Sequence, residues 1–262
     1  MKIGIRTASL KMPLDEALQT AGRLGYDGVE AVTADEGQLR GWLEESGPAG
    51  AAALRDAAAR AGTSISSFSL AIYRRVNLAQ EDEALRQQGV LLVSDALRAC
   101  RNVGGVAVLL PHFDRERLDV SAAEEARFAA GLREVAPVAE ETGVAIAIET
   151  SFSAAQLRRI TDAVGSTLVG VYQDVANAVI YHQDPAATIR ALGPAIKMVH
   201  VKDTRDGGQA PLGAGTVDWP SSRAALKEIG YHGWFVLETP PGDDPAASAA
   251  TYLDFTRRWL DG

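Results

Sequence analysis

The chain has 262 residues, of which 47% are hydrophobic and 23% are charged, and its formal net charge is −8 at pH 7. This composition is typical of a globular protein with enough apolar material for a core. The acidic balance and the lack of a basic stripe argue against a nucleic-acid partner. No apolar run approaches the roughly 18 residues of a membrane helix. The N-terminus lacks the apolar region of a signal peptide, and the single cysteine, Cys100, fits a reducing compartment, so we expect a cytoplasmic protein with no membrane partner.

Short apolar runs and longer helical stretches alternate along the chain. The runs that predict strands lie at residues 2–7, 28–32, 64–70, 105–110, 144–150, 168–174, 196–203 and 234–239. Stretches rich in Ala, Leu, Arg and Glu predict helices at 14–25, about 36–61, 81–102, 121–143, 153–165, 184–193, 219–230 and 244–260. Asp-Pro pairs at 184–185 and 244–245 are typical of helix N-termini, where proline occupies the first helical position.

Short strands separated by helices imply parallel pairing with crossover connections. Eight such units in about 250 residues have the usual size of a (β/α)₈ TIM barrel, and we expect residues 1–262 to form a single domain of this α/β class. A doubly wound open sheet is the alternative fold. The sequence contains neither of the glycine-rich phosphate-binding motifs that often accompany that sheet.

Polar residues end four successive predicted strands. They are Glu149, Asp174, His200 and Glu238, and in a barrel the C-terminal strand ends share one mouth. Successive residues of a strand point to opposite faces, so Glu149 shares its face with Ala147 and Ala145. Such small residues suit a crowded barrel interior. The alternation therefore predicts that all four polar side chains point towards the barrel axis.

Three carboxylates that converge without compensation repel one another, and a divalent cation removes this cost. Three oxygen ligands and one imidazole suit Mn²⁺ first, with Mg²⁺, Co²⁺, Fe²⁺ or Zn²⁺ as alternatives. We therefore predict one divalent metal ion at the barrel mouth, held by Glu149, Asp174, His200 and Glu238. The alternative without a metal site is that each of the four is an ordinary polar residue at a strand end that faces a loop.

The segments AIAIET, YQDVAN, HVKD, LGAGTVDW and FVLET, between residues 144 and 239, resemble the sugar phosphate isomerase/epimerase family of xylose isomerase-like TIM barrels. The resemblance implies the same four metal ligands. It also implies a metal-dependent isomerase or epimerase of a small sugar, sugar phosphate, inosose or hydroxy-carbonyl compound. In this chemistry a carboxylate removes a proton from carbon to give a metal-stabilised cis-enediolate. Glu149 and Glu238 are the expected catalytic carboxylates.

Asn177 departs from the pattern of ketose 3-epimerases in that family, which commonly carry histidine three residues after the metal-binding aspartate. Asparagine cannot exchange a proton, but it can hydrogen-bond a substrate hydroxyl. The other expected substrate-binding residues lie at or beyond strand ends: Lys202, Arg205, Arg6 and His112. Glu30 is interpreted as a partner of a metal ligand or of Arg6. Residues 73–75 follow the third strand and are interpreted as part of a lid.

Two other functions use the same barrel. One is a lyase of the inosose dehydratase type, which uses the same enediolate, and the other is a non-catalytic sugar-binding barrel. Apurinic endonucleases with this fold need a zinc cluster with more histidines than the four present here, and a basic surface. The expected partner is a small carbohydrate or hydroxy-carbonyl substrate. A homo-oligomer is left open, because its contacts cannot be read from one sequence.

Overall fold

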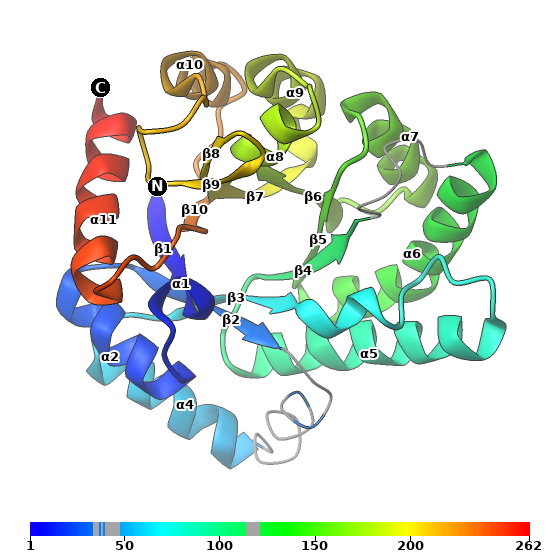
Figure 1. Cartoon of the computed structure of the whole chain (residues 1–262). Coiled ribbons are helices and arrows are strands. Elements are labelled where there is room, and N and C mark those ends of the chain that lie inside the picture. Colours follow the sequence, from blue (N-terminus) through cyan, green and yellow to red (C-terminus); the bar gives the residue numbers. More distant parts are fainter. Residues whose placement is uncertain (34–36, 38, 40–47, 114–120) are drawn as a thin grey trace.

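A computed structural model gives the architecture of the chain and describes residues 1–33, 37, 39, 48–113 and 121–262. Eight parallel strands close into a barrel in the order β1-β10-β7-β6-β5-β4-β3-β2 (Figure 1). The strands are β1 (Lys2–Arg6), β2 (Gly28–Thr33), β3 (Ile65–Leu70), β4 (Ala107–His112), β5 (Ala145–Thr150), β6 (Val169–Asp174), β7 (Ile196–Val201) and β10 (Trp234–Leu237). The predicted TIM barrel is confirmed.

Helices surround the barrel (Figure 1). They are α1 (Thr7–Leu10), α2 (Leu14–Leu24), α4 (Pro48–Arg60), α5 (Glu83–Asn102), α6 (Ala122–Thr142), α7 (Ala154–Val164), α8 (Val175–Ile180), α9 (Pro185–Leu192), α10 (Trp219–Glu228) and α11 (Pro245–Asp261), with 3₁₀ turns η1 (Ala71–Arg74) and η2 (Gly193–Ala195). Helix α4 covers the C-terminal part of the helix predicted at 36–61. Residues 36, 38 and 40–47 of that prediction lie outside the described residues. Within the described ranges, none of the helices has the length and apolar character needed to cross a membrane.

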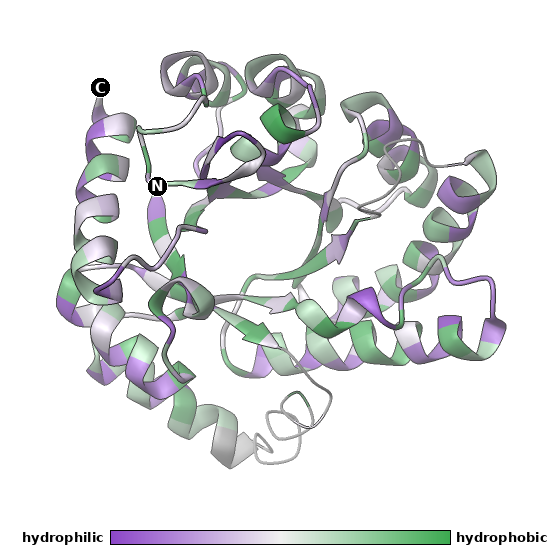
Figure 2. Ribbon diagram, in the orientation of Figure 1, coloured by the Kyte–Doolittle hydropathy of each residue, from purple (hydrophilic) through white to green (hydrophobic). Residues whose placement is uncertain are grey.

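Two layers of apolar side chains form the core. The inner layer fills the barrel and consists of Ala107, Leu109, Ala145, Ala147, Tyr172, Met198, Trp234 and Val236. The outer layer lies between the strands and the helices, where the alternate strand residues pack. Figure 2 shows this arrangement as largely hydrophobic strands inside helices that carry both hydrophobic and hydrophilic residues. The small inner residues of β5 leave room for the bulkier Tyr172 of β6 and Met198 of β7.

Helix N-termini follow the sequence signals. The side chain of Asp184 accepts a hydrogen bond from the amide of Ala187 at 3.1 Å and begins α9. Asp244 does the same for α11, with acceptor distances of 3.0 and 3.1 Å to two amides. Such a bond satisfies an amide that the helix itself leaves unpaired. These caps fix the residues at which α9 and α11 begin, after the strands β6 and β10.

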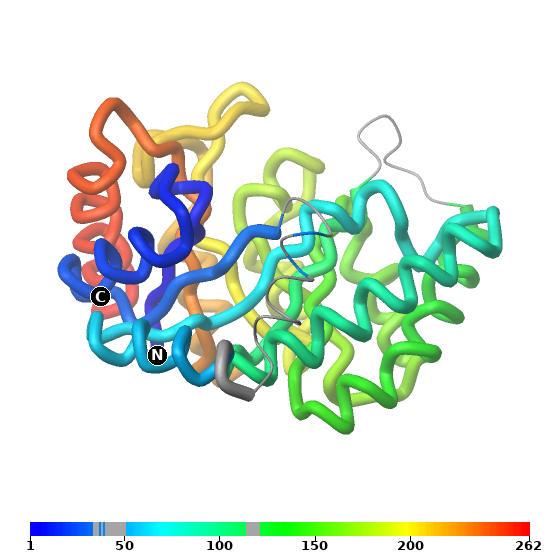
Figure 3. The backbone as a smooth tube through the Cα atoms, turned by 90° about the horizontal axis from the view of Figure 1, so that it is seen from below, coloured from blue at the N-terminus to red at the C-terminus, as the bar shows by residue number. Residues whose placement is uncertain are grey.

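A hairpin follows β7 and corrects one strand prediction. The strand predicted at 196–203 ends at Val201, and Asp203 begins a separate antiparallel pair, β8 (Asp203–Arg205) and β9 (Gly208–Ala210). The Asp203 carboxylate accepts hydrogen bonds from the amides of Gly213 and Gly215 at 2.9 and 3.0 Å, and from the Trp219 indole at 3.3 Å. Asp203 thus anchors the loop between β7 and α10, which projects from the barrel in Figure 3.

Candidate active site and metal centre

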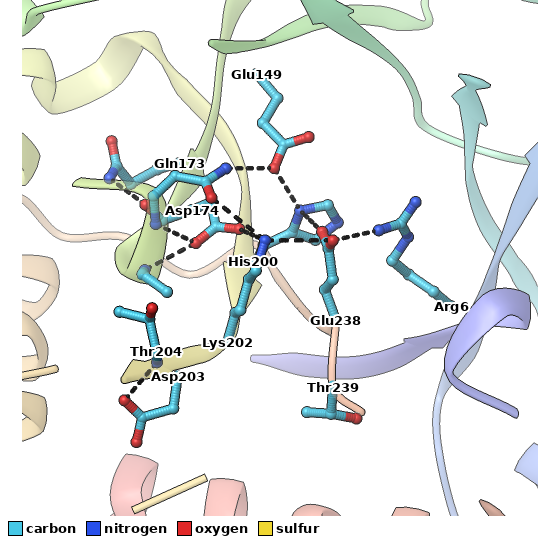
Figure 4. A network of polar contacts seen from close by, with 12 residues as sticks. Arg6, Glu149, Gln173, Asp174, His200, Lys202, Asp203, Thr204, Glu238 and Thr239 are labelled. Carbon is cyan, nitrogen blue, oxygen red and sulfur yellow. Dashed lines mark hydrogen bonds and ion pairs between the residues drawn. The ribbon is translucent and has the colours of Figure 1, made fainter. Parts of the chain in front are cut away.

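Four polar side chains gather at the C-terminal mouth of the barrel. Each of Glu149, Asp174, His200 and Glu238 offers one ligand atom, and these atoms all lie within 4.8 Å of one another. Figure 4 shows the side chains pointing towards a common centre. Glu149, Asp174 and His200 continue the inward faces of β5, β6 and β7, two residues beyond Ala147, Tyr172 and Met198 of the inner layer. The alternation of strand residues therefore brings the predicted four together.

Glu238 reaches this group although it lies just beyond its strand. Strand β10 ends at Leu237, one residue before Glu238 and two before the end of the predicted strand. The Glu238 amide still donates to the Val201 carbonyl at 3.1 Å, which extends the contact with β7 by one residue. This bond keeps the glutamate on the inward side.

His200 is the centre of the polar network and is completely buried. Its Nδ1 lies 3.3 Å from Glu149 Oε1 and 3.1 Å from Glu238 Oε2. Its Nε2 lies 3.1 Å from Glu30 Oε1, and the other oxygen of Glu30 accepts from the Ser67 hydroxyl at 2.9 Å. A metal-ligating histidine commonly donates its second ring N–H to a carboxylate, which fixes the ring and its tautomer. Glu30 is therefore placed to orient His200 with Nδ1 towards the three carboxylates.

Arg6 joins the two sides of this network. Its Nε lies 3.1 Å from Glu30 Oε1 and its Nη1 lies 2.7 Å from Glu238 Oε1. Burial alone would raise the pKa of Glu238, but the charges of Arg6, His200 and Lys202 lower it to about 2. Glu238 is accordingly a carboxylate at neutral pH. Glu30 thus contacts both His200, a candidate metal ligand, and Arg6, in line with both interpretations of this residue.

Asn177 and Lys202 contact the opposite edge of the site. Asn177 Nδ2 donates to Glu149 Oε1 at 2.9 Å, and Lys202 Nζ donates to Asn177 Oδ1 at 3.2 Å. Lys202 Nζ also lies 3.4 Å from carboxylate oxygens of Asp174 and Glu238. Burial, and then the charge of Glu238, raise the pKa of Glu149. The two glutamates thus have different surroundings, with cations around Glu238 and an amide beside Glu149.

The donor set fits a divalent metal ion. One oxygen of Asp174 accepts from the amides of Ala176 and Asn177 at 2.7 and 2.9 Å, where α8 begins. Among the described residues, its other oxygen, Oδ2, and Oε2 of Glu238 are buried and accept no hydrogen bond, although the cations Lys202 and His200 lie 3.4 and 3.1 Å from them. Buried carboxylate oxygens in this state are costly unless a cation or donor binds them. The carboxylates of Glu149, Asp174 and Glu238 and the imidazole of His200 form a candidate divalent metal site.

A cavity of about 550 Å³ opens above these side chains. Three of the five expected substrate-binding residues line it, namely Arg6, Asn177 and Lys202, together with the glutamates Glu149 and Glu238. The remaining lining residues come from the ends of strands and the segments that follow them: Ser69, Ala71, Arg74, Pro111, Phe113, Ile180, Tyr181 and Gly207. The sequence alone points to Arg74 through the lid interpretation of residues 73–75. It carries no signal for Phe113 or Tyr181, because these side chains meet only after the barrel closes.

His112 and Arg205 are not among the residues that line this cavity. The imidazole of His112 is stacked on Phe128 with ring centroids 4.0 Å apart and an interplanar angle of 6°. The Arg205 guanidinium donates to the carbonyl of Ala214 within the loop that follows β7. The expected substrate contacts of these two residues stay predictions, and their observed contacts lie outside the cavity. His112 points to the helices outside the barrel because its place in β4 has the outward parity, and Arg205 stabilises its own loop.

Comparisons with known proteins give a consistent result. The model of the xylose isomerase-like TIM barrel family matches residues 18–259. L-ribulose-5-phosphate 3-epimerase UlaE of Salmonella paratyphi C is 30% identical over 256 residues, which cover 92% of this chain and 88% of that protein. A crystal structure of D-psicose 3-epimerase has a TM-score of 0.83 and 21% identity, with both chains covered completely. The IOLI protein with a bound zinc atom has a TM-score of 0.84 and 20% identity, with coverage of 99% and 98%.

Proposed function

The chain belongs to the xylose isomerase-like TIM barrel family, and on this premise we propose that it is a divalent-metal-dependent 3-epimerase of a ketose or ketose phosphate. The observation that carries the proposal is the position of Glu149 and Glu238, whose oxygens approach the same imidazole nitrogen of His200 at 3.3 and 3.1 Å. Two carboxylates at the floor of one cavity can serve the two faces of a single substrate carbon. The relatives named as 3-epimerases support this reaction.

Glu149, Asp174, His200 and Glu238 would hold the ion, for which we propose Mn²⁺ first because the ligand set is mainly oxygen. When bound, such an ion supplies a Lewis acid that makes the proton on the carbon next to a ketone more acidic. The zinc atom bound to the IOLI protein, which has a similar fold, keeps Zn²⁺ as an alternative.

The chain itself supplies the proton transfer. One of Glu149 and Glu238, as a carboxylate, removes the proton from C3 of the ketose, and the other, as a carboxylic acid, gives its own proton to the opposite face. Asn177 lies beside Glu149, Lys202 lies beside Glu238, and both line the cavity, so each can exchange a contact at the floor for a hydrogen bond to a substrate oxygen. Burial of the floor strengthens each of these interactions, because fewer water molecules compete for the same donors.

The proposal is tested with metal-loaded protein in D₂O and a panel of ketoses and ketose phosphates. We expect deuterium at C3 and formation of the C3 epimer, both lost when the metal is removed by a chelator. The same mass spectra separate the two alternatives. Loss of water from the substrate indicates a lyase, and ligand binding without any C–H exchange indicates a sugar-binding barrel. Either result would overturn the epimerase proposal.

A further inference from the structure

Three cationic side chains line the cavity, and two of them are already engaged. Arg6 contacts carboxylates through Nε and Nη1, and its Nη2 donates to the Ser69 hydroxyl at 3.4 Å. Lys202 has an amide oxygen at 3.2 Å and two carboxylate oxygens at 3.4 Å. Each side-chain nitrogen of these two residues therefore lies within ion-pair or hydrogen-bond distance of a neighbouring side chain. Neither is available to bind a second anion without giving up a contact that holds the site.

Arg74 is the third cation, and its situation differs. It ends the 3₁₀ turn η1 directly after β3, and its side chain is exposed at the rim of the cavity. Its guanidinium lies 5.9 Å from the centre of the Phe113 ring. Among the described residues no carboxylate lies within ion-pair distance of Arg74. The guanidinium is thus held over an aromatic face while its N–H groups stay available for an incoming ligand.

The charge distribution fixes which end of a ligand can reach Arg74. At the floor, the cations Arg6 and Lys202 already contact the carboxylates of Glu238 and Asp174, so they are not free for a second anion. The rim carries the guanidinium of Arg74 and the rings of Phe113 and Tyr181, whose centroids lie 6.2 Å apart at 26°. A ligand with a hydroxy-ketone at one end and an anion at the other therefore has one favourable orientation. The volume of about 550 Å³ is in the usual range for small-molecule sites.

We propose that Arg74 is the specificity-determining residue that binds a phosphate group at the end of the ketose remote from the metal site. The inference rests on the proposed function and names its substrate class, a ketose phosphate rather than a free ketose. Arginine suits this task because its planar fork can donate two parallel hydrogen bonds to phosphate oxygens. The ring of Phe113 supports the fork through its aromatic face.

The experiment compares kcat/KM for pentulose 5-phosphates and hexulose 6-phosphates with that for the matching free ketoses. The variants are Arg74→Gln, Arg74→Lys and, as a matched control, Arg75→Gln, which changes an exposed neighbouring arginine that does not line the cavity. Arg74→Gln is expected to lower kcat/KM for the phosphates roughly ten- to a hundredfold, mainly through KM, since a charge-assisted contact remote from the reacting carbon is lost. Arg74→Lys should recover part of the loss, and Arg75→Gln should have no effect.

Inhibition by inorganic phosphate gives a second readout that does not depend on turnover of a phosphorylated substrate. Inorganic phosphate should compete with a free ketose in the wild-type protein and lose about tenfold or more in affinity in Arg74→Gln. Equal kcat/KM losses for free and phosphorylated ketoses, or no loss for either, would overturn the inference. If free ketoses exchange the C3 hydrogen and ketose phosphates have no higher kcat/KM in the wild-type protein, the phosphate-subsite proposal is overturned. The proposal that the protein is an epimerase then still holds. If no ketose of either kind exchanges, the proposed function itself has failed.

Discussion

Nε2 of His200 lies 3.1 Å from Oε1 of Glu30, and both side chains are completely buried. The two residues are 170 positions apart in the chain and come from strands on different sides of the barrel. This contact leaves Nδ1 of His200 as the ring nitrogen that faces the carboxylates. The orientation of the imidazole is therefore set before any ion binds.

Replacement of Glu30 by glutamine tests this orientation. Glu30→Gln removes the negative charge that His200 and Arg6 share, and we expect metal affinity to fall roughly ten- to a hundredfold. Turnover at saturating metal should fall much less, because the carboxylates that face the substrate remain. Titration calorimetry with Mn²⁺ measures the first effect and metal-saturated kinetics the second. Glu83→Gln on the surface of α5 is the control, and an unchanged affinity in Glu30→Gln would contradict the orienting role.

Metal binding should release protons. Burial alone would lower the pKa of His200, but Glu30 and Glu149 raise it to about 10, so the imidazole of the metal-free protein is protonated at neutral pH. A metal ion binds the neutral imidazole, so ion and proton compete for Nδ1. Affinity is therefore expected to rise with pH up to about 10, and to fall by about tenfold for each unit below it. Calorimetry in buffers of different ionisation enthalpy measures the released protons, and a heat that is independent of the buffer would contradict the prediction.

Asn177 should matter more for turnover than for metal binding. Asn177→Ala removes the donor to Glu149 and the acceptor from Lys202, and so loosens a carboxylate and a cation at the cavity floor. We expect kcat to fall roughly ten- to a hundredfold, in line with the value of hydrogen bonds to charged groups. Metal affinity should change by less, since Asn177 is not one of the four ligands. Steady-state kinetics and metal titration of the same preparation separate the two. A loss confined to metal affinity would contradict this role.

The loop after β7 should depend on Gly215. A Cβ atom at this position would overlap the Asp203 carboxylate and lie 2.5 Å from the carbonyl oxygen of Thr204. Gly215→Ala is therefore expected to cost about 1–3 kcal/mol of the free energy of unfolding through overpacking. Gly208→Ala in the same loop is the matched control, because a Cβ there would meet the Arg205 carbonyl oxygen at an ordinary contact distance of 3.6 Å. Urea unfolding compares the two, and equal stabilities would show that Asp203 can move without cost.

Strand-end residues can be predicted from the sequence because the direction of a strand side chain is a local property. The alternation along β5, β6 and β7 assigns Glu149, Asp174 and His200 to the inward face without knowledge of any other strand. His112 is a strand-end residue of the opposite parity. Its polar side chain at a strand end predicts a pocket residue, although its parity turns the ring outward to Phe128. The hairpin β8–β9 escapes prediction because two three-residue strands carry too little pattern to distinguish them from a loop.

The sequence by itself determined the barrel, the order of its units and the identity of the four candidate metal ligands, since these follow from periodicity and from where apolar runs stop. Tertiary structure alone decided how those ligands are held. The contact of His200 with Glu30 crosses the barrel, and the contact of Arg6 with Glu238 joins the first and last strands, which become neighbours only when the sheet closes. The surroundings of the Arg74 guanidinium, which has no carboxylate partner within the described part of the chain, are also decided by tertiary structure. The fold places the carboxylates of the site next to Arg6 and Lys202 and not next to Arg74. This is a long-range property that no local sequence pattern encodes.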